Sequence, residues 1–199
     1  MAGGPGGAGA HLLLCSRRAA LLDATVYDVA CRGFNIVGIV CDVTKPDEIE
    51  SVVAGTLAKF GSVDILINNA GTSWGAMPED MPLEKWQQVI DVNLNGCFLF
   101  AQAVGREMLK QNSGSIINIA SIAGLTSSAN GPFYAGYVAS KAGLIGLTRE
   151  LAASWGRKGI RVNAIAPGFF HSRLAAAVIA NYERSIPENT GIPRVVEEG

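Results

Sequence analysis

The sequence contains few charged residues, and they are nearly balanced in sign. Only 17% of its 199 residues are charged, with 16 Lys and Arg against 17 Asp and Glu. Because neither sign collects in a long block, we expect neither nucleic acid nor a membrane surface as a partner. The hydrophobic fraction of 49% excludes an intrinsically disordered chain, since it supplies enough apolar surface for a buried core. A low charge content is typical of a parallel sheet that is covered on both faces.

Cysteine is also scarce, and its spacing is not that of a metal site. The four cysteines, none of them in a C-x-x-C pair, are Cys15, Cys31, Cys41 and Cys97. We therefore expect no metal site, no disulfide framework and reduced thiols. No run approaches 18 uninterrupted apolar residues, and residues 1–10 have no basic segment followed by an apolar one, as a secretory signal would. These absences predict a cytoplasmic protein, and the length predicts a single domain over residues 1–199.

Short apolar runs alternate with helical periodicity along the chain. Strands are predicted at residues 11–15, 36–41, 63–67, 115–120 and 160–166, and helices at 17–32, 45–60, 82–112 and 135–156. Thr44 is the predicted N-cap of the second helix, and Pro46 suits its first turn. This alternation predicts an α/β fold, a doubly wound parallel sheet with helices on both faces.

Polar or turn residues follow three of the predicted strands. An Asn-Asn-Ala-Gly run occupies residues 68–71, Ser121 follows the next strand, and Pro167 follows the last. In an open parallel sheet, ligands bind in the crevice outside the carboxyl ends of the strands, so we expect these residues to face one crevice. Tyr137 and Lys141 lie at i and i+4, on one face of the next predicted helix. A Ser, a Tyr and a Lys can therefore converge in one small volume.

The Tyr-x-x-x-Lys spacing alone has a structural explanation as well. A buried tyrosine and a lysine whose stem lies along apolar surface give the same spacing on an amphipathic helix. Among the four tyrosines, only Tyr137 has a lysine at the fourth position, whereas Tyr134 has Val138 there. The functional interpretation therefore depends on the other residues around it.

The combined pattern resembles the short-chain dehydrogenase/reductase family from about residue 9 to about residue 194. The residues that carry the resemblance, in chain order, are Asn68, Asn69, Ala70, Gly71, Asn93, Ser121, Tyr137, Lys141, Asn163, Pro167 and Gly168. The resemblance implies a Rossmann-like sheet, an NAD(P)-dependent oxidoreductase and a homodimer or homotetramer. The loops are most similar to the gluconate 5-dehydrogenase branch, with 3-oxoacyl-carrier-protein reductases next.

The resemblance implies a role for each catalytic residue. Tyr137 passes a proton to or from the substrate oxygen while a nicotinamide carries the hydride, and Ser121 hydrogen-bonds that oxygen. Lys141 favours the ionised phenol and holds the nicotinamide ribose, and Asn93 anchors a water that links Lys141 to solvent. Ser121 and Tyr137 are 16 positions apart, about three more than is common in the family. Tyr134 has the commoner spacing but no lysine, so Tyr137 is preferred and Tyr134 is the alternative.

The same resemblance predicts the cofactor site. Ser16 and Arg17 come at the end of the first predicted strand. In the family, an acidic residue at this place accepts the ribose 2′-OH of NAD, whereas an arginine accommodates the 2′-phosphate of NADP. NADP(H) is therefore preferred over NAD(H), although an exposed arginine that opens a helix is the alternative for Arg17. The other expected contacts, from adenine to carboxamide, are Asp42, Val43, Asn69, Ala70, Gly71, Tyr137, Lys141, Pro167, Gly168 and Ser172.

Residues 4–9 match G-x-G-x-x-G literally, yet they precede the first predicted strand. The dinucleotide fingerprint follows a strand and opens a helix, so that the pyrophosphate meets the helix N-terminus. We therefore expect the family's first strand, its Gly-rich loop and its first helix to be missing, and its last helix and strand as well. The missing strand would be central in the 3-2-1-4-5-6 order.

Two functions remain open. The first is an NADP-dependent oxidoreductase that acts on a secondary alcohol or ketone of the sugar-acid or 3-oxoacyl type. The second is a truncated, catalytically inactive chain that acts at most as a subunit or interaction surface. Residues 169–194 are expected to form a substrate lid, in which His171 is expected to be solvated rather than catalytic.

Overall fold

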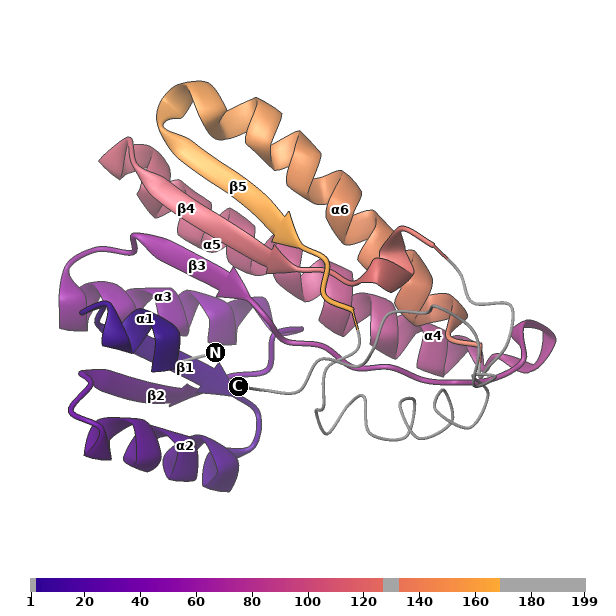
Figure 1. Ribbon diagram of the computed structural model, residues 1–199, viewed down its shortest axis with the longest axis horizontal. Helices are drawn as coiled ribbons and strands as arrows, with labels where there is room; N and C mark the ends of the chain where they lie inside the picture. Colours follow the sequence, from indigo (N-terminus) through magenta and orange to yellow (C-terminus); the bar gives the residue numbers. More distant parts are fainter. Residues whose placement is uncertain (1–2, 127–132, 169–199) are drawn as a thin grey trace, which may run out of the picture.

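The strands form two parallel sheets that do not pair with each other (Figure 1). The structure, a computed structural model, describes residues 3–126 and 133–168. One sheet pairs β1 (Leu12–Ser16) with β2 (Ile36–Val40), and the other has the order β3 (Ile65–Asn68), β4 (Gly114–Ile119) and β5 (Ile160–Ile165). The predicted α/β fold is confirmed. The sheets separate between β1 and β3, which is where the family's first strand was expected to be missing.

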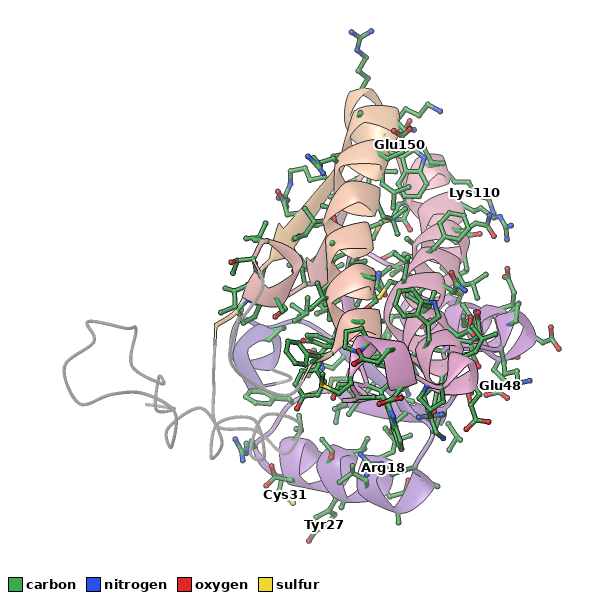
Figure 2. The ribbon with its side chains drawn as sticks, turned by 90° about the vertical axis from the view of Figure 1, so that its right-hand side faces the viewer. Arg18, Tyr27, Cys31, Glu48, Lys110 and Glu150 are labelled. Carbon is green, nitrogen blue, oxygen red and sulfur yellow. The ribbon has the colours of Figure 1, made fainter. Side chains whose placement is uncertain are left out.

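Helices lie between the strands and cover the sheets. The helices are α1 (Gly3–Gly7), α2 (Ala19–Cys31), α3 (Pro46–Phe60), α4 (Leu83–Ile90), α5 (Gly96–Gln111) and α6 (Ala135–Trp155). The shorter turns are η1 (Pro78–Asp80), η2 (Asp91–Asn95), η3 (Ile122–Gly124) and η4 (Gly156–Lys158). Figures 1 and 2 show α5 and α6 side by side along the β3–β4–β5 sheet. No helix among the described residues is long and apolar enough to span a membrane.

The ends of α2 and α3 follow from local chemistry. Gly33 and Gly61 come directly after the last helical turns with φ values of 85° and 82°, in the left-handed region that favours glycine. Pro46 occupies the first turn of α3, as predicted. The prediction of Thr44 as the N-cap was wrong: Lys45 holds that position, because the Thr44 hydroxyl donates instead to Asp42 Oδ1 at 2.9 Å.

The helix predicted over residues 82–112 is continuous but changes its winding in the middle. Between α4 and α5, η2 is a π-helical turn that contains Asn93. The extra residue in such a turn shifts the facing of the side chains, and π-turns are frequent at functional sites. Asn93 is fully buried there, directed toward the segment that follows β3.

The apolar core lies between α3, α5 and the β3–β4–β5 sheet. Its buried members on these elements are Ile49, Val52, Val53, Phe100, Ala101, Ala103, Val104, Met108, Ile116, Ile160 and Val162. Cys41 and Cys97 are also buried, and burial raises the pKa of these thiols to about 12 and about 11. Cys31 is exposed and lies with Tyr27 on the outer side of α2, as Figure 2 shows.

A buried polar chain joins β3, β4 and α6 behind the carboxyl ends of the strands. Asn68 Nδ2 donates to Asn118 Oδ1 at 2.9 Å, and Asn118 Nδ2 donates to Thr148 Oγ1 at 2.9 Å. Asn118 is 1% exposed, and no described buried side-chain polar atom lacks a partner. Because Asn118 bonds to both of the others, its removal takes one buried hydrogen bond from Asn68, which keeps its bond to the Cys97 carbonyl, and one from Thr148, which keeps its bond to the Leu144 carbonyl.

Replacement of Asn118 by leucine is expected to lower the free energy of unfolding by about 2–4 kcal/mol, because the Asn68 amide and the Thr148 hydroxyl each lose a buried hydrogen-bond partner. Urea unfolding measures this change. Asn95→Leu, the same substitution at an exposed position, is the control and should change stability by less than about 0.5 kcal/mol. Equal effects of the two substitutions would show that the buried chain contributes no stability of its own.

Candidate active site

Lys141 is a buried cation at the carboxyl end of β4. It lies on α6, is 4% exposed, and its Nζ donates to the Ile119 carbonyl at 2.6 Å. Burial lowers the pKa of this ammonium, while the nearby Cys97 opposes the shift. The bond to Ile119 holds the ammonium at the sheet edge where β4 ends.

Tyr137 lies one helical turn before Lys141 and shares its face of α6. The Lys141 Nζ is 5.7 Å from the centre of the Tyr137 ring. Tyr134 has a different environment: it is the residue before α6, and its ring packs against Gly75, where an added Cβ would lie 2.9 Å from a ring carbon. Burial raises the pKa of the Tyr134 phenol, which makes it the weaker candidate for proton exchange.

Ser121 is brought to the same place by the segment after β4. Its Oγ accepts a hydrogen bond from the Ala123 N–H at 3.1 Å, so Ser121 is the N-cap of η3. The adjacent Ile122 N–H donates to the Pro167 carbonyl at 3.1 Å, so the ends of β4 and β5 are joined there. η3 also packs closely on α6, because a Cβ at Gly124 would lie 2.7 Å from the Lys141 backbone. The structure therefore brings Ser121, Pro167 and Lys141 together.

Asn93 connects this cluster to the segment after β3. Its Oδ1 accepts from the Thr72 N–H at 2.8 Å, and its Nδ2 donates to the Thr72 carbonyl at 2.9 Å and to Ser140 Oγ at 3.0 Å. The Ser140 hydroxyl donates in turn to the Tyr137 carbonyl at 2.7 Å. The Asn93 amide is therefore fully used in bracing the site. Its expected role in holding a water stays a prediction.

Gly71 places the Asn-Asn-Ala-Gly segment beside the buried lysine. A Cβ at Gly71 would lie 3.7 Å from Asn93 Oδ1 and 3.9 Å from Lys141 Nζ. The backbone at Gly71 therefore lies close to the ammonium and to the Asn93 amide. Gly71 also belongs to the lining of the cavity described below.

Three more residues expected to bind the cofactor, Arg17, Asp42 and Val43, lie at the carboxyl end of the β1–β2 sheet. Arg17 follows β1, and its Nη1 is 3.6 Å from Asp42 Oδ2, with 53% of the arginine side chain exposed. Burial alone would raise the pKa of Asp42, but the N–H and O–H of Thr44 and the cation of Arg17 hold the pKa of Asp42 below its usual range. Val43 packs against Gly96, at the start of α5.

A cavity of about 1250 Å³ is lined by cofactor residues from both sheets. Its lining includes Ser16, Arg17 and Val43 on one side and residues 69–71 on the other. Ser121 and Tyr137 are not part of this lining, so the cavity and the catalytic cluster meet at Gly71. Ser172 and His171, and the lid expected over residues 169–194, lie outside the described residues.

Sequence reasoning did not find Thr72, Ser140 or the Ile119 carbonyl. Ser140 had a weak signal, since it is a polar residue one position before Lys141 and three after Tyr137. A backbone carbonyl has no signal in the side-chain pattern. In residues 3–126 and 133–168, no group of three His, Cys, Asp or Glu side chains is placed to hold a metal ion.

Comparison with known proteins identifies the family. The family model of the short chain dehydrogenase matches residues 2–183. The chain belongs to the short-chain dehydrogenase family. The family, its fold and its oxidoreductase class, predicted from the residue pattern, are thereby confirmed.

The relatives include reductases and sugar-acid dehydrogenases. A 3-oxoacyl-[acyl-carrier-protein] reductase of Synechocystis is 44% identical over 147 residues, which are 74% of this chain and 58% of that protein. The chain therefore spans less than two thirds of the length of this relative.

Two solved structures are also similar. A gluconate 5-dehydrogenase from Burkholderia cenocepacia, in complex with NADP and tartrate, has a TM-score of 0.83 and 32% identity over 90% of this chain and 69% of that chain. An actinorhodin polyketide ketoreductase with NADPH has a TM-score of 0.85 and 35% identity over 90% of this chain and 68% of that chain.

The lowered pKa of Asp42 predicts a pH dependence of stability. The charge of Asp42 stabilises the native state above its unfolded pKa of about 3.8, and this contribution is lost as the pH falls through the lower native pKa. Asp42→Asn, which keeps an acceptor oxygen but no charge, should therefore be less stable than the wild type near neutral pH. The difference should shrink as the pH falls below about 3.8. Urea unfolding over a pH series measures it.

Thr44→Val is the matched variant, because it removes one of the two hydrogen bonds to the Asp42 carboxylate and leaves the charge in place. It should show a smaller difference from the wild type in the same pH range. A difference between Asp42→Asn and the wild type that does not change with pH would contradict the assigned stabilisation of the carboxylate.

Proposed function

We propose that the chain is an NADP-dependent oxidoreductase that transfers hydride between a nicotinamide and a secondary alcohol or ketone. The observation that carries this proposal is the Lys141 ammonium, held at 2.6 Å by the Ile119 carbonyl and placed beside the Tyr137 ring, Gly71 and the end of β4. A cation, a phenol and a hydroxyl at one sheet edge are the groups needed to exchange a proton with a carbonyl oxygen.

The residues present fit both ends of a dinucleotide. At one end, Arg17 offers a guanidinium to a phosphate, and Asp42 and Val43 flank the same edge of the first sheet. At the other end, Gly71 lies beside Lys141 and lines the same cavity as Arg17, and a nicotinamide ribose would be held there by Lys141. When bound, the nicotinamide supplies or accepts the hydride.

Residues 3–126 and 133–168 contain no glycine-rich loop that follows a strand and could bind the pyrophosphate of the cofactor. The backbone N–H groups of Ala8 and Gly9, the last two residues of the literal G-x-G-x-x-G match, donate to the carbonyls of residues 4–6 and are therefore not free to bind phosphate. This agrees with the expectation that the match is not a phosphate-binding fingerprint.

Each side chain of the site has its own part in moving a proton to or from the substrate oxygen. The Tyr137 hydroxyl gives its proton to the substrate oxygen in reduction and takes it back in oxidation. The Ser121 hydroxyl hydrogen-bonds the same oxygen. Lys141 favours the ionised phenol and donates to the ribose, and Asn93 and Ser140 keep α6 and the Thr72 segment in place around it.

NADP is the proposed cofactor because of Arg17. Its partner Asp42 lies at 3.6 Å across an exposed surface, where an ion pair contributes little, so the guanidinium is free to turn to a 2′-phosphate. One similar structure was solved with NADP and another with NADPH, while a similar xylitol dehydrogenase was solved with NAD+. The proposed substrates are 3-oxoacyl thioesters or sugar acids, after the names of the relatives. The proposed state is a cytoplasmic homodimer or homotetramer.

Titration of the 199-residue chain with NADPH, followed by nicotinamide fluorescence, tests the cofactor assignment. Saturable binding is expected, and Arg17→Glu should weaken the affinity for NADPH about tenfold or more while changing that for NADH much less, because it replaces a cation at the 2′-phosphate by an anion. The absence of NADPH binding would overturn the proposal and favour the catalytically inactive chain.

Two tyrosine variants test the catalytic assignment. Tyr137→Phe should lower kcat/KM for reduction of a 3-oxoacyl thioester about 10²- to 10⁴-fold, because it removes the proton donor and keeps the ring. Tyr134→Phe makes the same change three residues away and should retain most of the activity. A large loss only in Tyr134→Phe would assign the reaction to Tyr134 instead.

A further inference from the structure

Tyr137 lies in the first turn of a helix that has no side-chain cap. α6 begins at Ala135, and the residue before it, Tyr134, makes no capping hydrogen bond with its side chain. The first turn contains no acidic residue, and its second position is Gly136. A missing cap and a glycine both favour fraying of a helix end. Other contacts must therefore hold this turn if the Tyr137 hydroxyl is to keep one position.

The second turn of α6 is fixed by hydrogen bonds of its own. Lys141 donates to the Ile119 carbonyl at 2.6 Å. Ser140 donates to the Tyr137 carbonyl at 2.7 Å and accepts from Asn93 Nδ2 at 3.0 Å. These bonds hold the helix from Tyr137 onward. They do not reach the residues before Tyr137, where the helix begins.

The segment after β3 holds the beginning of α6 at two points. The Ala76 N–H donates to the Phe133 carbonyl at 3.0 Å. The Tyr134 ring lies on Gly75, where an added Cβ would be 2.9 Å from one ring carbon and 3.5 Å from two others. The Tyr134 carbonyl accepts from the Val138 N–H at 2.9 Å, so the residue that makes the ring contact also starts the helix.

α4 lies beside the same turn, but less closely (Figure 1). A Cβ at Gly136 would lie 3.4 Å from Trp86 Cε3 and 3.6 Å from Val89 Cβ, which are ordinary van der Waals distances. The space between Gly136 and α4 therefore admits a Cβ, whereas the space between Gly75 and Tyr134 does not. The ring on Gly75 is the tighter of the two contacts.

We propose that Tyr134 is a positioning residue for Tyr137: its ring on Gly75 holds the first turn of α6 and so sets where the Tyr137 hydroxyl meets the substrate oxygen. The ring has this role, and the Tyr134 hydroxyl does not. The proposal rests on the proposed function, in which Tyr137 exchanges the proton. Displacement of a reacting group by about 1 Å can lower a rate about 10²-fold. Because the contact acts on the place of Tyr137 rather than on substrate binding, its loss should lower kcat and leave KM nearly unchanged.

The first test removes the ring and keeps the backbone. Tyr134→Ala should lower kcat for reduction of a 3-oxobutyryl thioester by NADPH about 10- to 100-fold and change KM by less than about threefold. Tyr134→Phe keeps the ring and should recover most of that loss. Tyr27→Ala is the matched control, because Tyr27 is 73% exposed on the outer side of α2 (Figure 2), and it should behave like the wild type. The Tm of each variant is compared with that of the wild type first.

The second test reaches the same contact from the other side. The φ of Gly75 is not positive, so in Gly75→Ala the added Cβ acts through the ring that it displaces. This variant should also lower kcat, but it should have little further effect in a chain that already carries Tyr134→Ala. Gly146→Ala, on α6, is the control, since a Cβ there has no neighbour within 4 Å.

Amide hydrogen exchange measures the first turn without any reaction. In Tyr134→Ala, the Val138 amide, which donates to the carbonyl of residue 134, should exchange about tenfold faster than in the wild type. The Leu151 amide, near the other end of α6, should change no more than the free energy of unfolding accounts for.

Several results would overturn the proposal. Unchanged kcat or unchanged Val138 exchange in Tyr134→Ala would each do so, as would a rise in KM alone. An equal loss in Tyr134→Phe would assign the effect to the hydroxyl, and additive losses from Gly75→Ala and Tyr134→Ala would show two independent effects. A wild type that reduces no substrate would contradict the proposed function instead, and Val138 exchange would still decide whether the ring holds the turn.

Discussion

The hydrogen bond from Lys141 to the Ile119 carbonyl is the contact on which the site depends. An ammonium that is 4% exposed has lost nearly all of its hydration, and no described carboxylate lies within ion-pair distance of it. A buried charge of this kind is costly unless polar atoms surround it. The carbonyl at the end of β4 is one such atom, and it positions the cation at the edge of the sheet. The Tyr137 ring, Gly71 and η3 are arranged around that position.

Neutral polar contacts, rather than ion pairs, hold the surrounding elements. The π-helical turn directs Asn93 at Thr72, and Ser140 links Asn93 to the backbone of Tyr137. Behind them, the chain through Asn118 joins β3, β4 and α6. The salt bridges lie on the outer surface, where they contribute little. The site is therefore held together by hydrogen bonds around the β3–β4–β5 sheet, while Arg17, Asp42 and Val43, expected at the adenosine, lie at the end of the β1–β2 sheet.

Much of the fold could be predicted because periodicity and turn chemistry are local properties. The runs around Leu13, Ile116 and Val162 are strands, and Gly33 and Gly61 follow the ends of helices, as expected. The π-turn at Asn93 could not be predicted, since one extra residue in a turn hardly changes an apolar pattern. The failed cap at Thr44 has a different cause: its hydroxyl donates to the carboxylate of Asp42, two residues earlier, and the sequence pattern does not show which of two local partners a hydroxyl takes.

The candidate site was predictable as a set of residues at strand ends, but its internal contacts were not. Parallel strands bring their carboxyl ends to one edge, which explains why Ser121, Lys141 and Pro167 could be grouped from the sequence. The lysine at the fourth position already favoured Tyr137 over Tyr134, and the packing adds a contrast that the sequence could not show: the Tyr134 ring lies on Gly75, and the Tyr137 ring lies near the lysine. The division into two sheets followed from the strand order, whereas the directions of the backbone groups along β1 and β3 required the observed register.

Hydride transfer itself tests the central claim most directly. The chain would be incubated with NADPH deuterated at both C4 positions and with a 3-oxobutyryl thioester, and the product would be examined by mass spectrometry. The account predicts one deuterium on the carbinol carbon of the product from the wild type, and none from Tyr137→Phe on the same time scale. Bound NADPH with no deuterium transferred to the 3-oxobutyryl thioester by the wild type would contradict the account.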